Sequence, residues 1–487
     1  MTGVPGKRAL GARKTPTEGR TGMDGFFTIR LDKKAKEPLY VQLGEGVLEQ
    51  IARQELPAGS KLPAIRPLAA ALGVNPATVA AAYRYLEQKK AVYGQTGGGT
   101  FVSPIPYQQV PAPVESLRRW TEPAEAGAIN FIQSELPGDL FPSREFGQIF
   151  QALLEEEGGD AFRYEDSRGF GPLREVLSRM LAADGLRVPP DQLQIVSGAQ
   201  QGIDLAAKAL LHYGDVVILE RPTFSGAAAA FLSRGGRLLD VPLEPDGMDM
   251  ERLEAYLKLY RPRLVYMMTN FQTPTGISYS LAKKRRLLQL AEDYDFFVIE
   301  DDTASDLYYG EERPLPLKAL DHRNRVVYIK SFSRILMPGF RLGLMAFPRR
   351  LGSAMEKAKL TTDIATSSFL QKAACRYFSD GNWTAHRERV RRFGKERYKK
   401  ALIAARMAGL RDFTPPGGGV CLWIGTGEKP AEAVAGEARA QGVLVAPGSR
   451  FLLDEGESRA FRLCFTGVSE EALSRGMAKI GQILKKR

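Results

Sequence analysis

The 487-residue sequence contains only three cysteines and three histidines, and it has no long apolar run. Cys375, Cys421 and Cys464 lie far apart along the chain, so they form neither the ligand spacing of a metal site nor a disulfide framework. This cysteine usage predicts a reducing, cytoplasmic environment and no bound metal. Because a membrane-spanning helix needs about 18 consecutive apolar residues, the sequence also predicts no membrane span. The basic N-terminus has no apolar segment beside it and does not resemble a secretory signal.

The sequence is rich in positive charge near its N-terminus. Residues 1–103 contain 15 Lys and Arg against 8 Asp and Glu, whereas the other 384 residues contain 53 against 48. A basic segment of this kind favours a polyanionic partner, most simply nucleic acid. A basic solvated tail would have the same composition, so charge alone leaves both interpretations open.

Composition divides the chain into four parts. Residues 1–24 are rich in Gly, Thr and basic residues and predict a disordered tail, within which Met23 is an alternative start. Residues 25–103 have the apolar spacing of a small helical domain. Residues 104–128 contain five prolines, which predicts a semi-rigid linker. Residues 129–487 have the composition of an α/β domain, with a smaller subdomain expected from about residue 385.

Short apolar runs alternate with stretches of helical spacing in this last part. The apolar runs suit strands that are buried on both faces of a sheet. The stretches 199–211 and 281–294 suit helices between them, and the alternation predicts a mostly parallel sheet with right-handed crossovers. The predicted strands are Leu193–Ser197, Val216–Leu219, Leu264–Met268, Phe296–Glu300 and Val326–Lys330.

Two predicted helices and a hairpin follow one another in the basic N-terminal part. Gly73 provides the end of a helix over Ile65–Leu72. Asn75-Pro76 places a side-chain acceptor at an N-cap and proline at the first helical position, which predicts a second helix over 76–89. A glycine-rich turn within Val92–Val102 predicts a β-hairpin. Helix, tight turn, helix and hairpin together form the pattern of a winged helix-turn-helix.

This segment resembles the winged helix of GntR-type transcription regulators, through Leu62–Arg66, Leu72–Val79 and Gly97–Val102 in that order. The resemblance implies that the helix over 76–89 enters the major groove of double-stranded DNA, while the wing contacts phosphates or the minor groove. Because few side chains of this helix can bond base edges, we expect specificity to depend on dimer spacing and DNA shape. The residues assigned to DNA are Arg66, Asn75, Thr78, Arg84, Gly98 and Thr100.

Residues 129–487 resemble a fold-type-I, pyridoxal-phosphate-dependent aminotransferase. Tyr164–Arg174 matches the early substrate-side motif, and Ser197–Gly202 opens a helix whose N–H groups and dipole favour a phosphate. The resemblance implies that Asp301 binds the pyridine nitrogen and that Arg462 binds a substrate carboxylate. It assigns Phe224 to the ring face and Arg341 to the phosphate. The positions assigned to the cofactor are Gly198, Ala199, Gln200, Phe224, Thr273, Asp301, Thr303, Ser331, Ser333, Arg334 and Arg341.

A winged helix followed by such a domain is typical of the MocR-type subfamily of GntR regulators. The resemblance implies a multidomain fold, with an N-terminal winged helix-turn-helix and an α/β fold-type-I aminotransferase-like domain. This second domain is expected to contain a mostly parallel seven-stranded sheet and a smaller α+β subdomain. The resemblance further implies a head-to-tail homodimer in which the aminotransferase-like domain serves mainly as a sensor of a small-molecule effector.

Arg334 departs from the aminotransferase pattern at the position where the family has the lysine that forms a Schiff base with pyridoxal phosphate. Arginine stays charged and has no primary amine that could attack the aldehyde or move the substrate's α-proton. Thr273 and Thr303 also stand where the family usually has Asn and Tyr bonded to the cofactor's phenolic oxygen. We therefore expect no catalytic residue, and pyridoxal phosphate either bound without a covalent link or lost.

The sequence predicts a DNA-binding transcription regulator whose aminotransferase-like domain dimerises and senses a small anionic or amino-acid-like ligand. Two alternatives stay open. The first is a pyridoxal-phosphate-dependent aminotransferase with a DNA-binding domain, in which Lys330 replaces the missing lysine. The second is a degenerate domain kept only for dimerisation. The sequence does not identify the operator, the regulated genes or the effector, nor whether the protein activates or represses.

Overall fold

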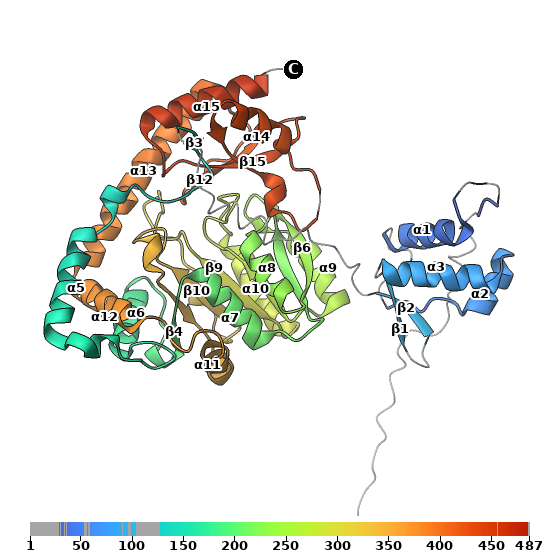
Figure 1. The fold of residues 1–487 in the computed structure, drawn as a ribbon, viewed down its shortest axis with the longest axis horizontal. Helices are drawn as coiled ribbons and strands as arrows, with labels where there is room; N and C mark the ends of the chain where they lie inside the picture. Colours follow the sequence, from blue (N-terminus) through green and yellow to red (C-terminus); the bar gives the residue numbers. More distant parts are fainter. Residues whose placement is uncertain are drawn as a thin grey trace, which may run out of the picture. The chain divides into compact units, whose positions relative to one another are not determined.

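The computed structural model describes residues 29–103 and 127–485, except for 30, 34, 36, 53–55, 57, 58, 90, 96–98 and 455. The chain divides into two compact units, the first ending at Tyr107 and the second beginning at Gln108 (Figure 1). The predicted tail over 1–24, with Met23, and nearly all of the predicted linker over 104–128 lie outside the described residues. Both therefore stay predictions.

The first unit packs three helices against a two-stranded hairpin. The helices are α1 (Leu39–Ala52), α2 (Ile65–Leu72) and α3 (Pro76–Gln88), and the strands are β1 (Val92–Gln95) and β2 (Gly99–Val102). The hairpin is antiparallel, with Val92 opposite Val102. Leu43, Leu68 and Leu86, one from each helix, are buried together in its core. The two helices and the hairpin that the sequence predicts are confirmed.

The turn between α2 and α3 has the conformation that its residues favour. Gly73 adopts a left-handed φ of 62°, a conformation that costs glycine little. The Asn75 side chain accepts a hydrogen bond of 2.8 Å from the backbone N–H of Ala77, and Pro76 is the first residue of α3. These local interactions fix the angle at which α3 leaves the turn, and hence the face that it presents.

The second unit is built on an eight-stranded sheet in the order β4-β11-β10-β9-β8-β5-β6-β7. The strands β5, β6, β8, β9 and β10 are parallel, whereas β11 is antiparallel to both β10 and β4. The resemblance implied seven strands in this sheet, and the structure has eight. The apolar runs alone predicted β4, β5, β8, β9 and β10, but not β6, β11 or the two-residue β7. The strands are β4 (Leu193–Val196), β5 (Val216–Arg221), β6 (Arg237–Glu244), β7 (Gly247–Met248), β8 (Leu264–Met267), β9 (Phe297–Asp302), β10 (Val326–Ser331) and β11 (Gly343–Ala346).

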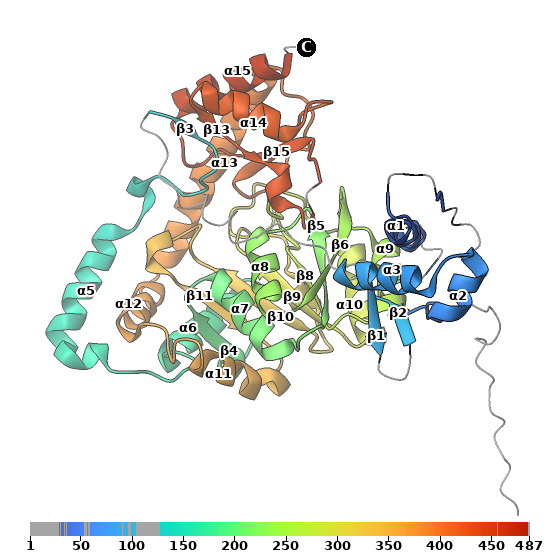
Figure 2. The ribbon, with the colours of Figure 1, turned by 45° about the vertical axis from the view of Figure 1, so that its right-hand side comes forward.

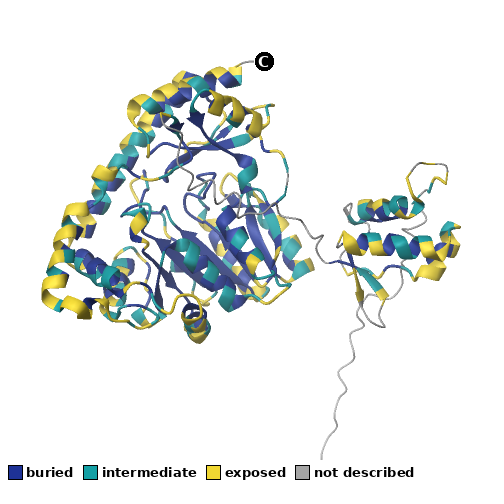
Figure 3. Ribbon diagram, in the orientation of Figure 1, coloured by how far each residue is buried: buried dark blue, intermediate teal, exposed yellow. Residues whose placement is uncertain are grey.

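Helices cover both faces of this sheet (Figures 1 and 2). One face packs against α7 (Ala199–Leu210), α8 (Ser225–Ser233) and α11 (Gly352–Leu360), and the other against α9 (Met250–Tyr260) and α10 (Leu281–Asp293). Beside β4 lie α5 (Ser143–Glu157), α6 (Gly171–Ala183) and α12 (Ser368–Ser379). Figure 3 shows the central strands of the sheet buried and the outer faces of the helices exposed. Burial on both faces explains why these central strands are continuous apolar runs.

A smaller subdomain contains β12 (Cys421–Gly425), β14 (Ala446–Pro447) and β15 (Ala460–Cys464) in one antiparallel sheet. It also contains α13 (Asn382–Ala408), which spans the predicted boundary near residue 385, α14 (Ala431–Ala440) and α15 (Glu470–Lys485). From the start of the unit, β3 (Ile129–Asn130) joins it by pairing with β13 (Val443–Leu444). The sequence did not predict this long-range pairing. Short 3₁₀ helices span Gly138–Leu140, Gly158–Phe162, Pro190–Gln192, Leu317–Leu320, Pro338–Phe340, Arg349–Leu351 and Gly448–Phe451.

The described residues lack two features, a membrane-spanning helix and a metal cluster. Among the helices within these residues, none has the length and apolar character needed to cross a membrane. The same part of the chain contains no group of three or more His, Cys, Asp or Glu side chains arranged to hold a metal ion.

Candidate functional site

The turn between β4 and α7 brings together residues that the sequence assigns to a phosphate. Gly198 has a φ of 90° and directly precedes Ala199, the first residue of α7, whose first-turn N–H groups lack helical partners. Arg341 lies beside this turn, with Nη2 donating to the Ser197 carbonyl (2.8 Å) and Nη1 to Ser333 Oγ (3.4 Å). A Cβ at position 198 would lie 2.6 Å from Arg341 Nη2, so glycine leaves room for the guanidinium. A helix N-terminus beside a guanidinium suits a phosphate or carboxylate.

The other polar residues of this region have structural partners. Gln200 Nε2 donates to the Gly226 carbonyl (2.9 Å), which ties α7 to α8. Ser331 Oγ accepts from the backbone N–H of Ser333 (3.2 Å), which orders the turn after β10. The side chains of Gln200 and Ser331 therefore shape the turn, while the backbone of α7 supplies the donors.

Asp301 is buried near the carboxyl end of β9. Its Oδ2 accepts from the Tyr266 hydroxyl (2.8 Å), whereas its Oδ1 is buried and has no hydrogen-bond partner among the described residues. Burial raises the pKa of Asp301 to about 7, because desolvation disfavours the charged carboxylate. A buried acceptor without a partner costs free energy, which a ligand N–H would recover.

Further buried polar atoms lack partners at the same edge of the sheet. They belong to residues that follow the carboxyl ends of β5, β9 and β10, where open α/β sheets bind ligands. The atoms are Thr223 Oγ1, Ser225 Oγ, Thr303 Oγ1 and Arg334 Nη1, each without a hydrogen-bond partner in the described part of the chain. Phe224 lies between two of them, and Thr273 is buried in the loop after β8. These loops place the predicted residues around one edge of the sheet.

Arg334 lies in the turn after β10 and interacts electrostatically with Asp301. Burial lowers the pKa of the guanidinium, and the charge of Arg334 in turn lowers the pKa of Asp301 against the larger effect of burial. Because arginine stays charged at neutral pH, the site contains a fixed positive charge beside the carboxylate.

Lys330 lies on the other face of the sheet. The register pairs Lys330 with Asp302 rather than with Asp301, and side chains of successive strand residues point to opposite faces. Lys330 Nζ lies 2.6 Å from Asp306 Oδ2, and Arg313 Nη2 lies 3.2 Å from Asp306 Oδ1. Burial alone would raise the pKa of Asp306, but these two cations outweigh it and lower the pKa to about 2. Lys330 thus belongs to a buried ion-pair network.

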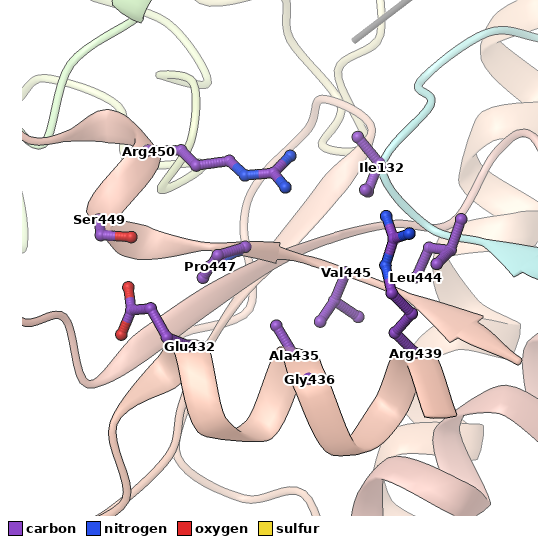
Figure 4. A pocket seen from close by; sticks show the side chains of 10 residues that line it. All are labelled: Ile132, Glu432, Ala435, Gly436, Arg439, Leu444, Val445, Pro447, Ser449 and Arg450. Atoms are coloured by element: carbon purple, nitrogen blue, oxygen red, sulfur yellow. The ribbon is translucent and has the colours of Figure 1, made fainter. Parts of the chain in front are cut away.

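Arg462 is almost fully buried on β15, where it contacts the protein itself. Its Nη2 donates to the Ile132 carbonyl (2.7 Å), and its guanidinium lies 5.3 Å from the centre of the Phe451 ring. The charge of Arg462 also lowers the pKa of Arg334, so the two residues are close enough to interact. Ile132 is also one wall of a pocket of about 540 Å³ in the small subdomain, into which Arg439 and Arg450 extend (Figure 4).

Cys421 and Cys464 form a pair that the sequence did not predict. They are opposite each other on β12 and β15, where the Cys421 thiol donates to the Pro274 carbonyl (3.5 Å) and the Cys464 thiol to the Ile132 carbonyl (3.7 Å). The charges of Arg334 and Arg462 reach both thiols. Each cysteine lies in a predictable apolar run, but the register that pairs them is a long-range property that no local signal reveals.

The residues assigned to DNA lie on the first unit. Arg66 on α2 and Arg84 on α3 are exposed, and neither takes part in any of the ion pairs between described residues. Thr78 and Thr100 are half-buried, and Asn75 uses its side-chain oxygen to cap α3. Gly98 lies outside the described residues. Lys61, which the sequence analysis did not select, is exposed and lies over the Phe101 ring of the wing.

Two family models together cover most of the chain. Residues 39–102 match the model described as "Bacterial regulatory proteins, gntR family", and residues 128–480 match "Aminotransferase class I and II". The first match coincides with α1 to β2, and the second contains the whole eight-stranded sheet.

Individual relatives support both matches. The chain is 30% identical to the HTH-type transcriptional regulator YisV of Bacillus subtilis (strain 168), over 91% of this chain and 96% of the relative. It is 27% identical to the probable rhizopine catabolism regulatory protein MocR of Rhizobium meliloti, over 92% and 94%. The solved structure of Pyrococcus horikoshii kynurenine aminotransferase matches 77% of this chain and 94% of its own, with a TM-score of 0.71 and 31% identity. The chain therefore belongs to the MocR-type subfamily of GntR regulators, in which a winged-helix domain precedes an aminotransferase class I and II domain.

Proposed function

We propose that this transcription regulator uses its aminotransferase-like domain to sense a small anionic or amino-acid-like ligand, rather than to transfer amino groups. The observation that carries the proposal is the set of buried, unpartnered polar atoms at the carboxyl edge of the sheet, led by Asp301 Oδ1 and Arg334 Nη1. Such atoms cost about 1–3 kcal/mol each when they are left unsatisfied. A ligand that bonds them would recover this free energy on binding.

The site fits the non-covalent contacts of pyridoxal phosphate, which the aminotransferase family normally binds. The first turn of α7 and Arg341 would hold the phosphate, Asp301 Oδ1 would accept a hydrogen bond from the ring nitrogen, and Phe224 would cover the ring. When bound, the cofactor supplies an electron sink. Arg334 offers a charged guanidinium in place of a primary amine, so it cannot supply a covalent link.

Arg334 and Asp301 together favour a ligand that carries both signs of charge. The unpartnered Nη1 of Arg334 would donate to a carboxylate or phosphate. Asp301, with a pKa near 7, would accept from a cationic N–H donor. An amino acid, or a pyridinium phosphate bound without a covalent link, has this combination.

Lys330 argues against the alternative of an active aminotransferase. Its side chain points away from Asp301, is almost fully buried, and is ion-paired with Asp306. Swinging its amine across the sheet would break this pair and leave Asp306 with fewer cations, at a cost of several kcal/mol.

Exposed aromatic residues support a homodimer, which the resemblance implies to be head-to-tail. Tyr164 is 84% exposed and Phe162 is 61% exposed, in and beside the segment that resembles the substrate-side motif of aminotransferases. Neighbouring exposed apolar side chains can form the kind of patch at which proteins associate. We propose that a second copy of the chain covers them.

The test of this proposal is a DNA titration with and without ligand. Full-length protein is titrated against a fluorescent duplex taken from upstream of its own gene, with a scrambled duplex as control, at one stated salt concentration. The proposal predicts preference for the upstream duplex and a change in affinity when pyridoxal phosphate or an amino acid is added. Equal binding to both duplexes would contradict the DNA-binding role. Amino-group transfer to a 2-oxo acid that is lost in Asp301→Asn would contradict the sensing role.

A further inference from the structure

Cys421 and Cys464 lie opposite each other in a geometry that permits a disulfide. The backbone N–H of Phe465 donates to the Val420 carbonyl (3.0 Å), so the neighbouring Cys421–Cys464 pair is a non-hydrogen-bonded pair of β12 and β15. In agreement, the N–H of Cys464 points away from β12 and donates to the Phe131 carbonyl (2.8 Å). Such pairs have Cα atoms about 4.5 Å apart, at the short end of the disulfide range of roughly 4.4–6.8 Å.

Two arginines give these thiols an electropositive environment. Arg462 precedes Cys464 by two residues on β15, so both side chains lie on the same face of the strand. The adjacent Cys421 thiol, together with Arg462 and Arg334, lowers the pKa of Cys464 to about 6 against the effect of burial. The adjacent Cys464 thiol, together with burial, raises the pKa of Cys421. Both side chains are almost fully buried, with Cys421 5% exposed and Cys464 0% exposed.

We propose that Cys421 and Cys464 form a dithiol that is oxidised to a disulfide by hydroperoxides. Cys464 is assigned as the attacking thiol because it shares a face of β15 with Arg462, and Cys421 as the resolving thiol because it is the cross-strand partner. Both are free in the structure, as is Cys375 on α12. The proposal does not depend on whether the domain binds pyridoxal phosphate.

The reaction has two steps. First, the Cys464 thiolate attacks the terminal oxygen of the hydroperoxide; an S–O bond forms, the O–O bond breaks, and the leaving oxygen takes a proton. Sulfur loses two electrons and the peroxide gains them, which leaves Cys464 as a sulfenic acid. Second, Cys421 sulfur attacks Cys464 sulfur; the S–S bond forms, the S–O bond breaks, and the hydroxyl leaves as water with the Cys421 proton. With hydrogen peroxide, the products are one disulfide and two waters.

Cys375 provides an internal reference for this reactivity. It is half-buried, and burial raises the pKa of its thiol. Cys464 is fully buried, so the lower pKa of its thiol must outweigh the restricted access of the peroxide for Cys464 to react before Cys375. We expect Cys464 to be oxidised before Cys375 at pH 7.

The experiment uses the reduced full-length protein and hydrogen peroxide. Samples are quenched with an alkylating agent, digested with trypsin and analysed by mass spectrometry. The expected result is a cross-linked pair of peptides containing Cys421 and Cys464, which dithiothreitol separates, while Cys375 stays alkylated. Both cysteines remaining alkylated at a peroxide concentration that oxidises Cys375 would overturn the proposal. This readout needs no variant, so a folding defect cannot obscure it.

Variants then assign the two roles. Cys375→Ser should leave the cross-link unchanged. Cys421→Ser should stop at the sulfenic acid of position 464, which dimedone traps, and Cys464→Ser should leave Cys421 alkylated. Thermal unfolding curves show whether each variant has kept its fold. A dimedone adduct on Cys421 in Cys464→Ser, at the wild-type rate, would refute the assignment of Cys464 as the attacking thiolate.

Discussion

Replacing Lys330 with methionine tests whether this lysine is structural. Lys330 Nζ and Asp306 Oδ2 are 2.6 Å apart, and both side chains are almost fully buried. Removing one partner of a buried ion pair usually costs about 3–5 kcal/mol, because the other charge is left buried. Arg313 at 3.2 Å and Arg387 at 3.9 Å still face Asp306, so part of this cost is offset. We expect Lys330→Met to lower the free energy of unfolding by about 2–4 kcal/mol.

The assay is urea-induced unfolding of the full-length chain at pH 7, followed by the fluorescence of its three tryptophans, Trp120, Trp383 and Trp423, which all lie in the second unit. Lys357→Met is the matched control, because Lys357 is exposed on α11 and its loss should change stability by less than about 0.5 kcal/mol. Combining Lys330→Met with Asp306→Asn should cost less than the sum of the single changes, with a coupling of about 1–3 kcal/mol.

The pH dependence gives the same interaction an independent readout. The pKa of Asp306 is lowered to about 2 from an ordinary 3.8, so its contribution is fully present above pH 4 and is lost as the pH falls toward 2. A shift of this size corresponds to about 2 kcal/mol. Unchanged stability in Lys330→Met, combined with loss of ligand binding, would refute the reasoning, since it would place Lys330 in the ligand site.

Three further predictions concern other parts of the molecule. Arg84→Ala should weaken DNA binding by about 1–3 kcal/mol in the labelled-duplex titration. Gln88 is exposed on the same helix, and Gln88→Ala should leave binding unchanged. An equal loss of affinity in both variants would contradict the placement of α3 in the groove. Gly198→Ala should abolish the rise in Tm that inorganic phosphate produces, because a Cβ at this position meets Arg341. Gly214→Ala is the control: Gly214 has the same φ of 90°, but a Cβ there has no atom within 4 Å, so this variant should keep the rise in Tm. Asp301→Asn should be more stable than the wild type above pH 7, and the difference should vanish toward pH 4. The reason is that folding raises the pKa of the Asp301 carboxyl to about 7, so ionisation of this group above its ordinary pKa disfavours the folded state. Lower stability of the variant at pH 8 would refute that shift.

Local signals explain what the sequence predicted correctly. Gly73 and Asn75-Pro76 act on their immediate neighbours, so the end of α2 and the start of α3 follow directly from them. The parallel strands β5, β8, β9 and β10 are buried on both faces, and their apolar runs are therefore visible without any knowledge of the sheet. Asp301 and Arg334 could be located because Asp301 lies near the end of the apolar run of β9 and Arg334 follows that of β10.

Features that depend on distant parts of the chain could not be predicted. The strand β3 pairs with β13 at the far end of the unit, and β7 is two residues long. The pairing of Cys421 with Cys464 depends on a register between strands that are far apart in the sequence. The ion pair of Lys330 with Asp306 depends on which face of β10 the lysine occupies. A one-residue change in the phase of that strand would have placed Lys330 beside Asp301.

The measurement that tests the central claim most directly is the intact mass of the full-length protein after pyridoxal phosphate and borohydride. Borohydride reduces a Schiff base to a stable amine, so a covalently linked cofactor stays with the protein. We predict saturable binding, seen as a change in protein fluorescence that desalting reverses, and an unchanged mass at stoichiometric cofactor. A mass increase of one cofactor per chain, located on Lys330 by peptide mapping and absent in Lys330→Met, would contradict the account. It would support the alternative of an aminotransferase in which Lys330 forms the Schiff base.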